Sequence, residues 1–239
     1  MFGQSKDGKG RSVWQIITGA NLKDLTPLEL QYHNPLKAVI GVSMSFEHDL
    51  QLSGVNFFLE GIIVYEKKTG NKKLYHTDYV LRGTTLDHPK PVRLKLRMIP
   101  DEDADTGYRY ELYLLYDEFA WDQDFHDQVL GDVTKEFYVN LDDEGNVLEE
   151  KRVYWRINDV FDPYVARVTS MKDVDQNGTI EDSELERSDV SYWDYSRITK
   201  DLDTEQDVTE YLLVEMDHDT RYFTLLRGRD IHPSQVSVI

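Results

Sequence analysis

The fold is decided by a stretch that alternates strictly between apolar and basic residues, Val92-Arg93-Leu94-Lys95-Leu96-Arg97-Met98. Alternation with a period of two predicts a β-strand, with one face in the core and the other in solvent. The alternation continues in Tyr108-Arg109-Tyr110-Glu111-Leu112, after an acidic turn. We therefore predict a β-hairpin over residues 92–116.

The basic row of this strand has two interpretations. Arg93, Lys95 and Arg97 could form a small basic recognition face, or a solvated face opposite acids such as Glu111. Lysine and arginine are mostly exposed in proteins, so we expect the solvated face.

Further strand-like segments flank turn signals along the rest of the chain. Aromatic residues make up 12% of the sequence, which is typical of sheets. The pattern predicts an α+β, predominantly β protein, whose antiparallel hairpins form one or two sheet-rich or barrel-like lobes. The additional predicted hairpins pair residues 55–65 with 73–81, 133–141 with 147–157, and 208–216 with 221–227.

Helical signals are few. Thr26 and Pro27 match an N-cap followed by proline in the first turn, which predicts a short helix through Gln31.

Composition and turn signals divide the chain into four parts. We expect a flexible N-terminal tail over 1–20, a β-rich lobe over 21–157, a connector with an EF-hand-like loop over 158–206, and a C-terminal hairpin over 207–239 that can pack on the first lobe.

The strongest chemical motif is an EF-hand-like calcium loop over residues 173–184. Ca²⁺ binds about six to eight oxygens, and EF-hand loops supply them from fixed positions. Gly178 stands at the position where the chain must turn sharply, and a residue without Cβ turns at the least cost. The predicted ligands are Asp173, Asp175, Asn177, the carbonyl of Thr179, a water held by Glu181, and a bidentate Glu184.

The flanks of this loop predict helices on both sides. Asp162-Pro163 matches a helix start, and Tyr164, Val168 and Met171 follow at helical spacing. A short exit helix would begin over residues 185–187. No second matching loop is found in the sequence, so we expect modest Ca²⁺ affinity, on the order of 10⁻⁵ to 10⁻³ M. The alternative is an acidic surface turn, since Asp, Asn and Gly are ordinary turn residues.

Acidic residues dominate the composition: 45 Asp and Glu oppose 27 Lys and Arg, for a net charge of -18. Such a surface repels phosphates and anionic headgroups, so we expect no nucleic-acid partner and favour a protein partner with a basic surface. The absence of cysteine excludes disulfides, thiolate metal sites and cysteine nucleophiles. No apolar run is long enough to span a bilayer or to form a signal-peptide core, so we expect a cytoplasmic location.

Catalytic motifs are mostly missing, so we expect a non-enzymatic binding or scaffolding protein. Residues 3–10 imitate a phosphate-binding loop, but Gly10 stands where a hydroxyl must meet Mg²⁺. The alternative is a divalent-metal-dependent hydrolase that uses Asp122, Asp124 and His126, which would share one face of a strand.

A third candidate is a carbohydrate-binding module. Trp121, Trp155 and Trp193 could stack on a sugar or a base, although tryptophans of a β-rich chain are more often in the core. Exposure of Trp121 or Trp193 in a groove would favour this candidate.

Short segments near the C-terminus carry a resemblance to a known family. They are Tyr192-Trp193-Asp194-Tyr195-Ser196-Arg197, Glu210-Tyr211-Leu212-Leu213-Val214-Glu215 and Leu226-Arg227-Gly228-Arg229-Asp230-Ile231. With these segments the chain resembles the YjfK-like family of uncharacterised bacterial proteins. The resemblance implies a cytosolic bacterial protein and supplies no catalytic residues, and the calcium loop is not a hallmark of that family.

Overall fold

The computed structural model of the protein describes residues 25–47, 52, 55–69, 72–83, 91–131, 136–141, 147–157, 164–171, 184–200 and 206–239. The tail expected over residues 1–20 lies outside them.

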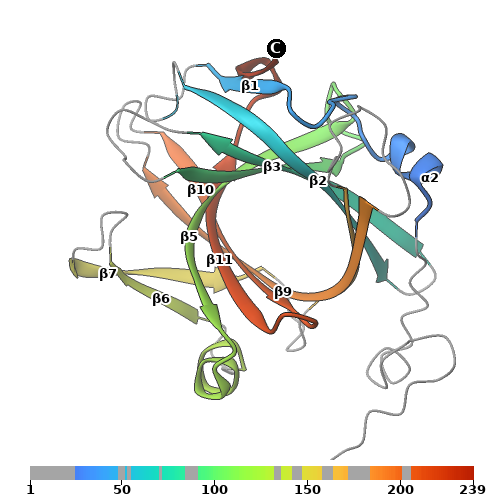
Figure 1. The fold of residues 1–239 in the computed structure, drawn as a ribbon. Coiled ribbons are helices and arrows are strands. Elements are labelled where there is room, and N and C mark those ends of the chain that lie inside the picture. Colours follow the sequence, from blue (N-terminus) through green and yellow to red (C-terminus); the bar gives the residue numbers. More distant parts are fainter. Residues whose placement is uncertain are drawn as a thin grey trace, which may run out of the picture.

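Strands of the described chain form a closed, 8-stranded antiparallel barrel (Figure 1). Each strand pairs with the next around the ring, and β8 closes the ring by pairing with β2 on one side and β9 on the other. The ring order is β2 (Asn56–Thr69), β3 (Lys72–Gly83), β4 (Val92–Pro100), β5 (Tyr108–Ala120), β11 (Tyr222–Asp230), β10 (Asp207–Asp217), β9 (Leu185–Lys200) and β8 (Tyr164–Met171).

Two long strands extend the sheet beyond the ring. One part of β2 pairs with β1 and a later part pairs with β8. In the same way, one part of β9 pairs with β8 and a later part pairs with β7. Figure 1 shows β6 and β7 projecting from the lower left of the barrel, while β1 and the C-terminus lie at its top. The outlying strands are β1 (Ser43–Phe46), β12 (Val236–Val238), β6 (Glu136–Leu141) and β7 (Val147–Arg156).

The described helices are short. In α2 (Pro27–Tyr32), the Thr26 hydroxyl accepts from the backbone N–H of Glu29 at 3.3 Å, and the Glu29 carboxylate accepts from the backbone N–H of Thr26 at 3.0 Å. This capping box confirms the predicted helix. The others are a π-helix, η1 (Phe125–Leu130), and a 3₁₀ turn, η3 (Pro233–Gln235). Within the described ranges, no helix has the length and apolar content to cross a membrane.

Apolar side chains pack in three clusters, two outside the barrel wall and one inside it. One outer cluster joins Leu30 of α2 to Leu96 of β4. The second joins Trp193 of β9 to Tyr154 of β7. The inner cluster includes Leu213 of β10, which is 1% exposed. Much of the wall is therefore covered on both faces, and many of the side chains that point inward are buried, as are many that point outward.

The predicted hairpins are confirmed. β2 pairs with β3, β4 with β5, β6 with β7, and β10 with β11, all antiparallel. The prediction of a predominantly β protein is confirmed as well. Local alternation and turn signals are sufficient to pair strands that follow one another directly.

The predicted helix that leads into the calcium loop is wrong. Residues 164–171 form β8, in which Val168 pairs with Tyr65 of β2. The helical spacing of three apolar residues is outweighed because β-branched side chains favour a strand and because β8 gains a partner on each edge.

The predicted exit helix is also wrong, since residues 185–187 begin β9. Met171 of β8 lies opposite Leu185 of β9, so residues 172–184 connect two neighbouring strands of the barrel. The range 158–206, which we expected to be a connector, thus contains two strands of the barrel wall.

Candidate functional site

The basic row of β4 points into the barrel. Leu94 and Leu96 pack in an outer cluster, at 2% and 0% exposure, so alternation turns Lys95 and Arg97 inward. The Arg97 side chain is 4% exposed and that of Lys95 is 14% exposed, while Arg93 is 57% exposed. The expectation of a solvated face is therefore wrong for Lys95 and Arg97.

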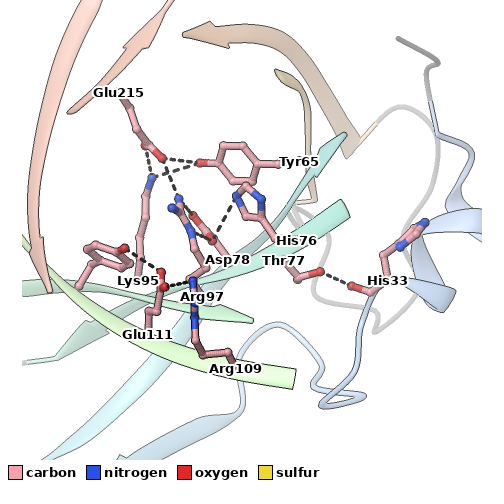
Figure 2. Close-up of polar contacts among 11 residues, drawn as sticks. His33, Tyr65, His76, Thr77, Asp78, Lys95, Arg97, Arg109, Glu111 and Glu215 are labelled. Carbon is pink, nitrogen blue, oxygen red and sulfur yellow. Dashed lines mark hydrogen bonds and ion pairs between the residues drawn. The ribbon is translucent and has the colours of Figure 1, made fainter. Parts of the chain in front are cut away.

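Arg97 is the centre of a buried network of charges (Figure 2). Its Nε and Nη2 donate to the two carboxylate oxygens of Asp78 at 2.8 and 3.0 Å, and Nη2 also donates to Glu215 at 3.2 Å. Asp78 lies beside Arg97 in the register of β3 and β4, whereas Glu215 reaches it from β10. Burial opposes the charge of Arg97, but the Asp78 carboxylate holds the pKa of the guanidinium well above its usual value. The Arg97 guanidinium is therefore charged.

Glu215 connects this pair to two donors on other strands. It accepts a hydrogen bond from the Tyr65 hydroxyl at 3.0 Å and forms an ion pair with the Lys95 ammonium. Lys95 also donates to the Tyr65 oxygen at 3.3 Å. Burial, together with the charge of Glu215, raises the pKa of Tyr65 well above its usual value. The phenol therefore stays protonated and serves as a donor.

Glu111 forms a second branch of the network. It lies opposite Arg97 in the register of β4 and β5. Its carboxylate accepts from the Tyr113 hydroxyl at 2.7 Å and from Arg109 at 2.7 Å. Burial and the charge of Glu111 raise the pKa of Tyr113 well above its usual value. The Arg97 guanidinium lies 5.2 Å from the centre of the Tyr113 ring, within the range of a cation–π contact.

Two other ionisable side chains of the barrel interior have pKa values that are shifted toward pH 7. Burial raises the pKa of Asp194 to about 6, although the positive charges of Arg97 and Lys67 act in the opposite direction. Burial also lowers the pKa of Lys67 to about 8, against the attraction of Asp194. Asp194 therefore changes its charge near pH 6, and Lys67 near pH 8.

His76 is a neutral side chain that lies beside the network. Its ring stacks on that of Tyr65, with a centroid distance of 4.3 Å and an interplanar angle of 15°. Burial, and then the positive charge of Arg97, hold the pKa of His76 well below its usual value. Nε2 is 4.0 Å from the nearest Asp78 oxygen, too far for a hydrogen bond. The histidine therefore contributes packing and no charge.

Toward one end of the barrel, the network forms the floor of a cavity of about 480 Å³. Tyr65, Lys95 and Glu215 line the floor, and their side chains are shielded from solvent. Small-molecule sites in proteins have volumes of about 300–1,000 Å³ and combine apolar walls with a few polar groups. The apolar wall includes Ile63, Val80, Leu115, Val168, Val190 and Leu226.

The mouth of the cavity is marked by side chains that are more exposed. The lining includes Glu60, Arg93 and Glu118, whose side chains are 42%, 57% and 46% exposed. Glu186 and Asp217 also line the cavity. Exposure therefore increases from the charged floor to a polar mouth, and the site is a pocket that is open at one end.

Most of the predicted calcium site lies outside the described residues. Glu184 is described, and it is buried at 8% exposure directly before β9. Among the residues with described positions, no three or more His, Asp or Glu side chains form a group that could hold a metal ion. The Ca²⁺ site stays a prediction. Its remaining predicted ligands, all outside the described part, are Asp173, Asp175, Asn177, Thr179 and Glu181.

The residues of the alternative hydrolase site lie at the start of η1. One Asp122 oxygen accepts from the backbone N–H of Phe125 at 2.7 Å, and His126 Nδ1 lies 2.8 Å from an Asp127 oxygen. These local contacts occupy Asp122 and His126. Together with Asp124 they form no metal-binding group in the described structure.

The three tryptophans of the described residues lie outside the cavity lining. Trp193 is 3% exposed in an outer cluster. Trp121 is half-buried and stacks on Phe223, with a centroid distance of 5.3 Å. Trp155 is exposed on β7. Neither Trp121 nor Trp193 therefore offers an open stacking platform for a sugar.

The acids and tyrosines of the barrel interior were not predicted from the sequence. Asp78 stands between Thr77 and Tyr79, and Glu215 between Val214 and Met216, in segments that were correctly predicted to be strands. A single carboxylate inside an apolar strand is the signal that could have been used, because such a residue needs a buried partner.

Comparison with known proteins yields no match to a family model, to a curated protein or to a solved structure. The resemblance to the YjfK-like family therefore stays a prediction.

Proposed function

We propose that the protein is a non-enzymatic binding protein that holds a small, largely apolar molecule inside its barrel. The observation that carries the proposal is the cavity of about 480 Å³, with an apolar wall and a shielded polar floor. Eight-stranded barrels are wide enough to hold one small ligand. The apolar wall would supply most of the contact area with the ligand. The polar groups of the floor would orient the ligand.

The floor is suited to hydrogen bonding with a ligand. An ammonium group has three donors, and Lys95 directs them to Glu215 and Tyr65 among the described residues. One N–H therefore remains for an acceptor on a bound molecule. The carboxylates of the floor are already hydrogen-bonded, which supports a role in recognition and not in proton transfer.

Blocking the cavity with a larger side chain tests the proposal. Ile63 lines the cavity, so Ile63→Trp should fill part of it. Ile198 is 76% exposed and does not line it, so Ile198→Trp is the matched control. We expect the emission of N-phenyl-1-naphthylamine to rise on binding to the wild type and the control, and its affinity to fall about tenfold or more in Ile63→Trp.

Far-UV circular dichroism of both variants establishes that the barrel is intact. Equal probe affinity in the two folded variants would place the probe outside the barrel and refute the proposal. A wild-type protein that binds neither this probe nor other apolar dyes would refute it as well.

We also propose that the protein binds Ca²⁺ at the loop, has a basic protein partner and is located in the cytoplasm. These three proposals rest on the sequence. Their support is the loop pattern over 173–184, the net charge of -18 and the composition of the chain. The buried position of Glu184 directly before β9 is compatible with a ligand that closes such a loop.

A further inference from the structure

The ion pairs at the floor of the cavity restrict the head group of the ligand. We infer that the cavity takes a ligand with an uncharged carbonyl or hydroxyl oxygen at its inner end, and that Lys95 and Glu215 together exclude carboxylate and ammonium groups from the floor. This inference rests on the proposed function, because it concerns the ligand of the same cavity.

Within the described residues of the floor, cations and carboxylates are equal in number (Figure 2). Glu215 forms ion pairs with Lys95 and Arg97, and Asp78 forms one with Arg97. Tyr65 donates to Glu215 and stays protonated, so it adds no charge. The two carboxylates therefore neutralise the two cations, and the floor as a whole has no net charge.

Other ionisable side chains of the barrel interior do not change this balance. His76 is uncharged, because burial and the charge of Arg97 hold its pKa well below the usual value. Lys67, Glu111 and Asp194 do not line the cavity. The head group of a ligand would therefore meet the ion pairs of Lys95 and Glu215 first.

A charged head group would disturb these ion pairs. A carboxylate that approaches Lys95 also approaches Glu215, and an ammonium that approaches Glu215 also approaches Lys95 and Arg97. The side chains of Lys95 and Glu215 are only 14% and 9% exposed, so water screens the repulsion poorly. Either head group would lose its hydration without gaining a free opposite charge, and burial of such a charge is costly.

An uncharged oxygen fits the floor and leaves the ion pairs in place. Lys95 directs two of its three donors to Glu215 and Tyr65 among the described residues. The third N–H can donate to a carbonyl or hydroxyl oxygen of the ligand. A ligand without an acceptor would leave this N–H unpaired in a shielded site, which is unfavourable. Lys95 is therefore a specificity-determining residue of the cavity.

Salt separates the effect of the floor from that of the net charge. Exposed charges are screened by salt, with a Debye length of about 8 Å at about 0.15 M and about 3 Å at about 1 M, while buried pairs are screened much less. Selectivity that comes from the floor should therefore persist when potassium chloride is raised between these two concentrations.

A set of ligands with the same number of carbons tests the inference on the full-length protein. 1-Decanol, 2-decanone, decanoate and decylammonium compete with bound N-phenyl-1-naphthylamine at about pH 7.5, where the acid and the amine are both charged. We expect 1-decanol and 2-decanone to bind about three to ten times more tightly than either charged ligand, at both salt concentrations.

Two variants of the floor should change the selectivity in opposite directions. Lys95→Met leaves the floor with one excess carboxylate, so an ammonium can take the place of Lys95 beside Glu215. We expect decylammonium to gain about tenfold in affinity relative to 1-decanol. Glu215→Gln leaves one excess cation, and we expect decanoate to gain by a similar factor.

Two exposed positions supply matched controls. Lys200→Met and Glu102→Gln change the net charge by the same amounts as the floor variants, but neither residue lines the cavity. The Lys200 side chain is 66% exposed. We expect both controls to keep the wild-type order of affinities. Far-UV circular dichroism shows which variants fold, and each floor variant has its own predicted gain, so one folded variant is sufficient.

The outcomes distinguish this inference from the proposed function. If all four compounds displace the probe equally well, the cavity binds ligands and the inference about the head group is wrong. If the floor variants keep the wild-type order, or if the controls change it as much, the selectivity does not come from Lys95 and Glu215. If no decyl compound displaces a bound probe, the proposed function fails with the inference.

Discussion

Replacement of Arg97 by methionine tests whether the charge network stabilises the barrel. Methionine keeps an unbranched stem between the rings of Tyr65 and Tyr113, but it removes the donors to Asp78 and Glu215. Asp78 is 0% exposed, so its carboxylate would stay buried without its bidentate partner. Loss of one partner of a buried ion pair costs about 3–5 kcal/mol of unfolding free energy.

The assay is urea unfolding followed by tryptophan fluorescence and far-UV circular dichroism. Urea m-values are about 1–3 kcal/mol/M, so the transition midpoint should fall by about 1–3 M. Arg93→Met is the matched control, because Arg93 lies on the same strand and the same face but is 57% exposed. Its ion pair with Glu118 spans 3.8 Å, and we expect a cost below about 0.5 kcal/mol.

A double-mutant cycle identifies the source of the loss. Asp78→Asn removes the charge that Arg97 neutralises, so the double variant should lose much less than the sum of the two single losses. A loss of stability in Arg97→Met no larger than that in Arg93→Met would refute a stabilising role of the network. Additive single losses would refute it as well, since the stability of the buried Asp78 carboxylate would then not depend on Arg97.

Three further predictions concern pH, packing and metal. Because burial raises the pKa of Asp194 to about 6, the folded state keeps a proton that the unfolded state releases from about pH 4 upward, so stability should fall as pH rises to about 6. The fall should reach up to about 3 kcal/mol, and Asp194→Asn should flatten it in urea titrations; an unchanged pH profile would contradict the assignment. A Cβ on Gly228 would lie 2.5 Å from the Tyr113 ring and 2.7 Å from a backbone oxygen, so Gly228→Ala should lose about 1–3 kcal/mol in thermal unfolding, and an unchanged melting temperature would show that the neighbours give way. Calorimetry should detect Ca²⁺ binding by the wild type, with a dissociation constant on the order of 10⁻⁵ to 10⁻³ M, and clear weakening in Glu184→Gln; no heat in the wild type, or equal binding by the variant, would leave the loop as an acidic turn.

The sequence by itself determined the local pairing of this protein. Alternation in 92–98 and the acidic turn that follows predicted β4 and β5, and the structure pairs them in antiparallel register. Thr26, Pro27 and Glu29 likewise determine α2, because the capping contacts lie within four residues of one another. In each case the interacting groups are close in the chain, so propensity and turn chemistry are sufficient to place them.

Only the tertiary structure decided which side of each strand faces the interior and what lies there. Alternation separates Leu96 from Arg97, but it does not say that the apolar face is covered from outside while the charged face closes around Asp78 and Glu215. The partner of Arg97 on β10 is 118 residues away in sequence, and its contact exists only once the ring has closed. The same closure makes residues 164–171 a strand in spite of their helical spacing, because pairing with β2 and β9 supplies backbone hydrogen bonds on both edges.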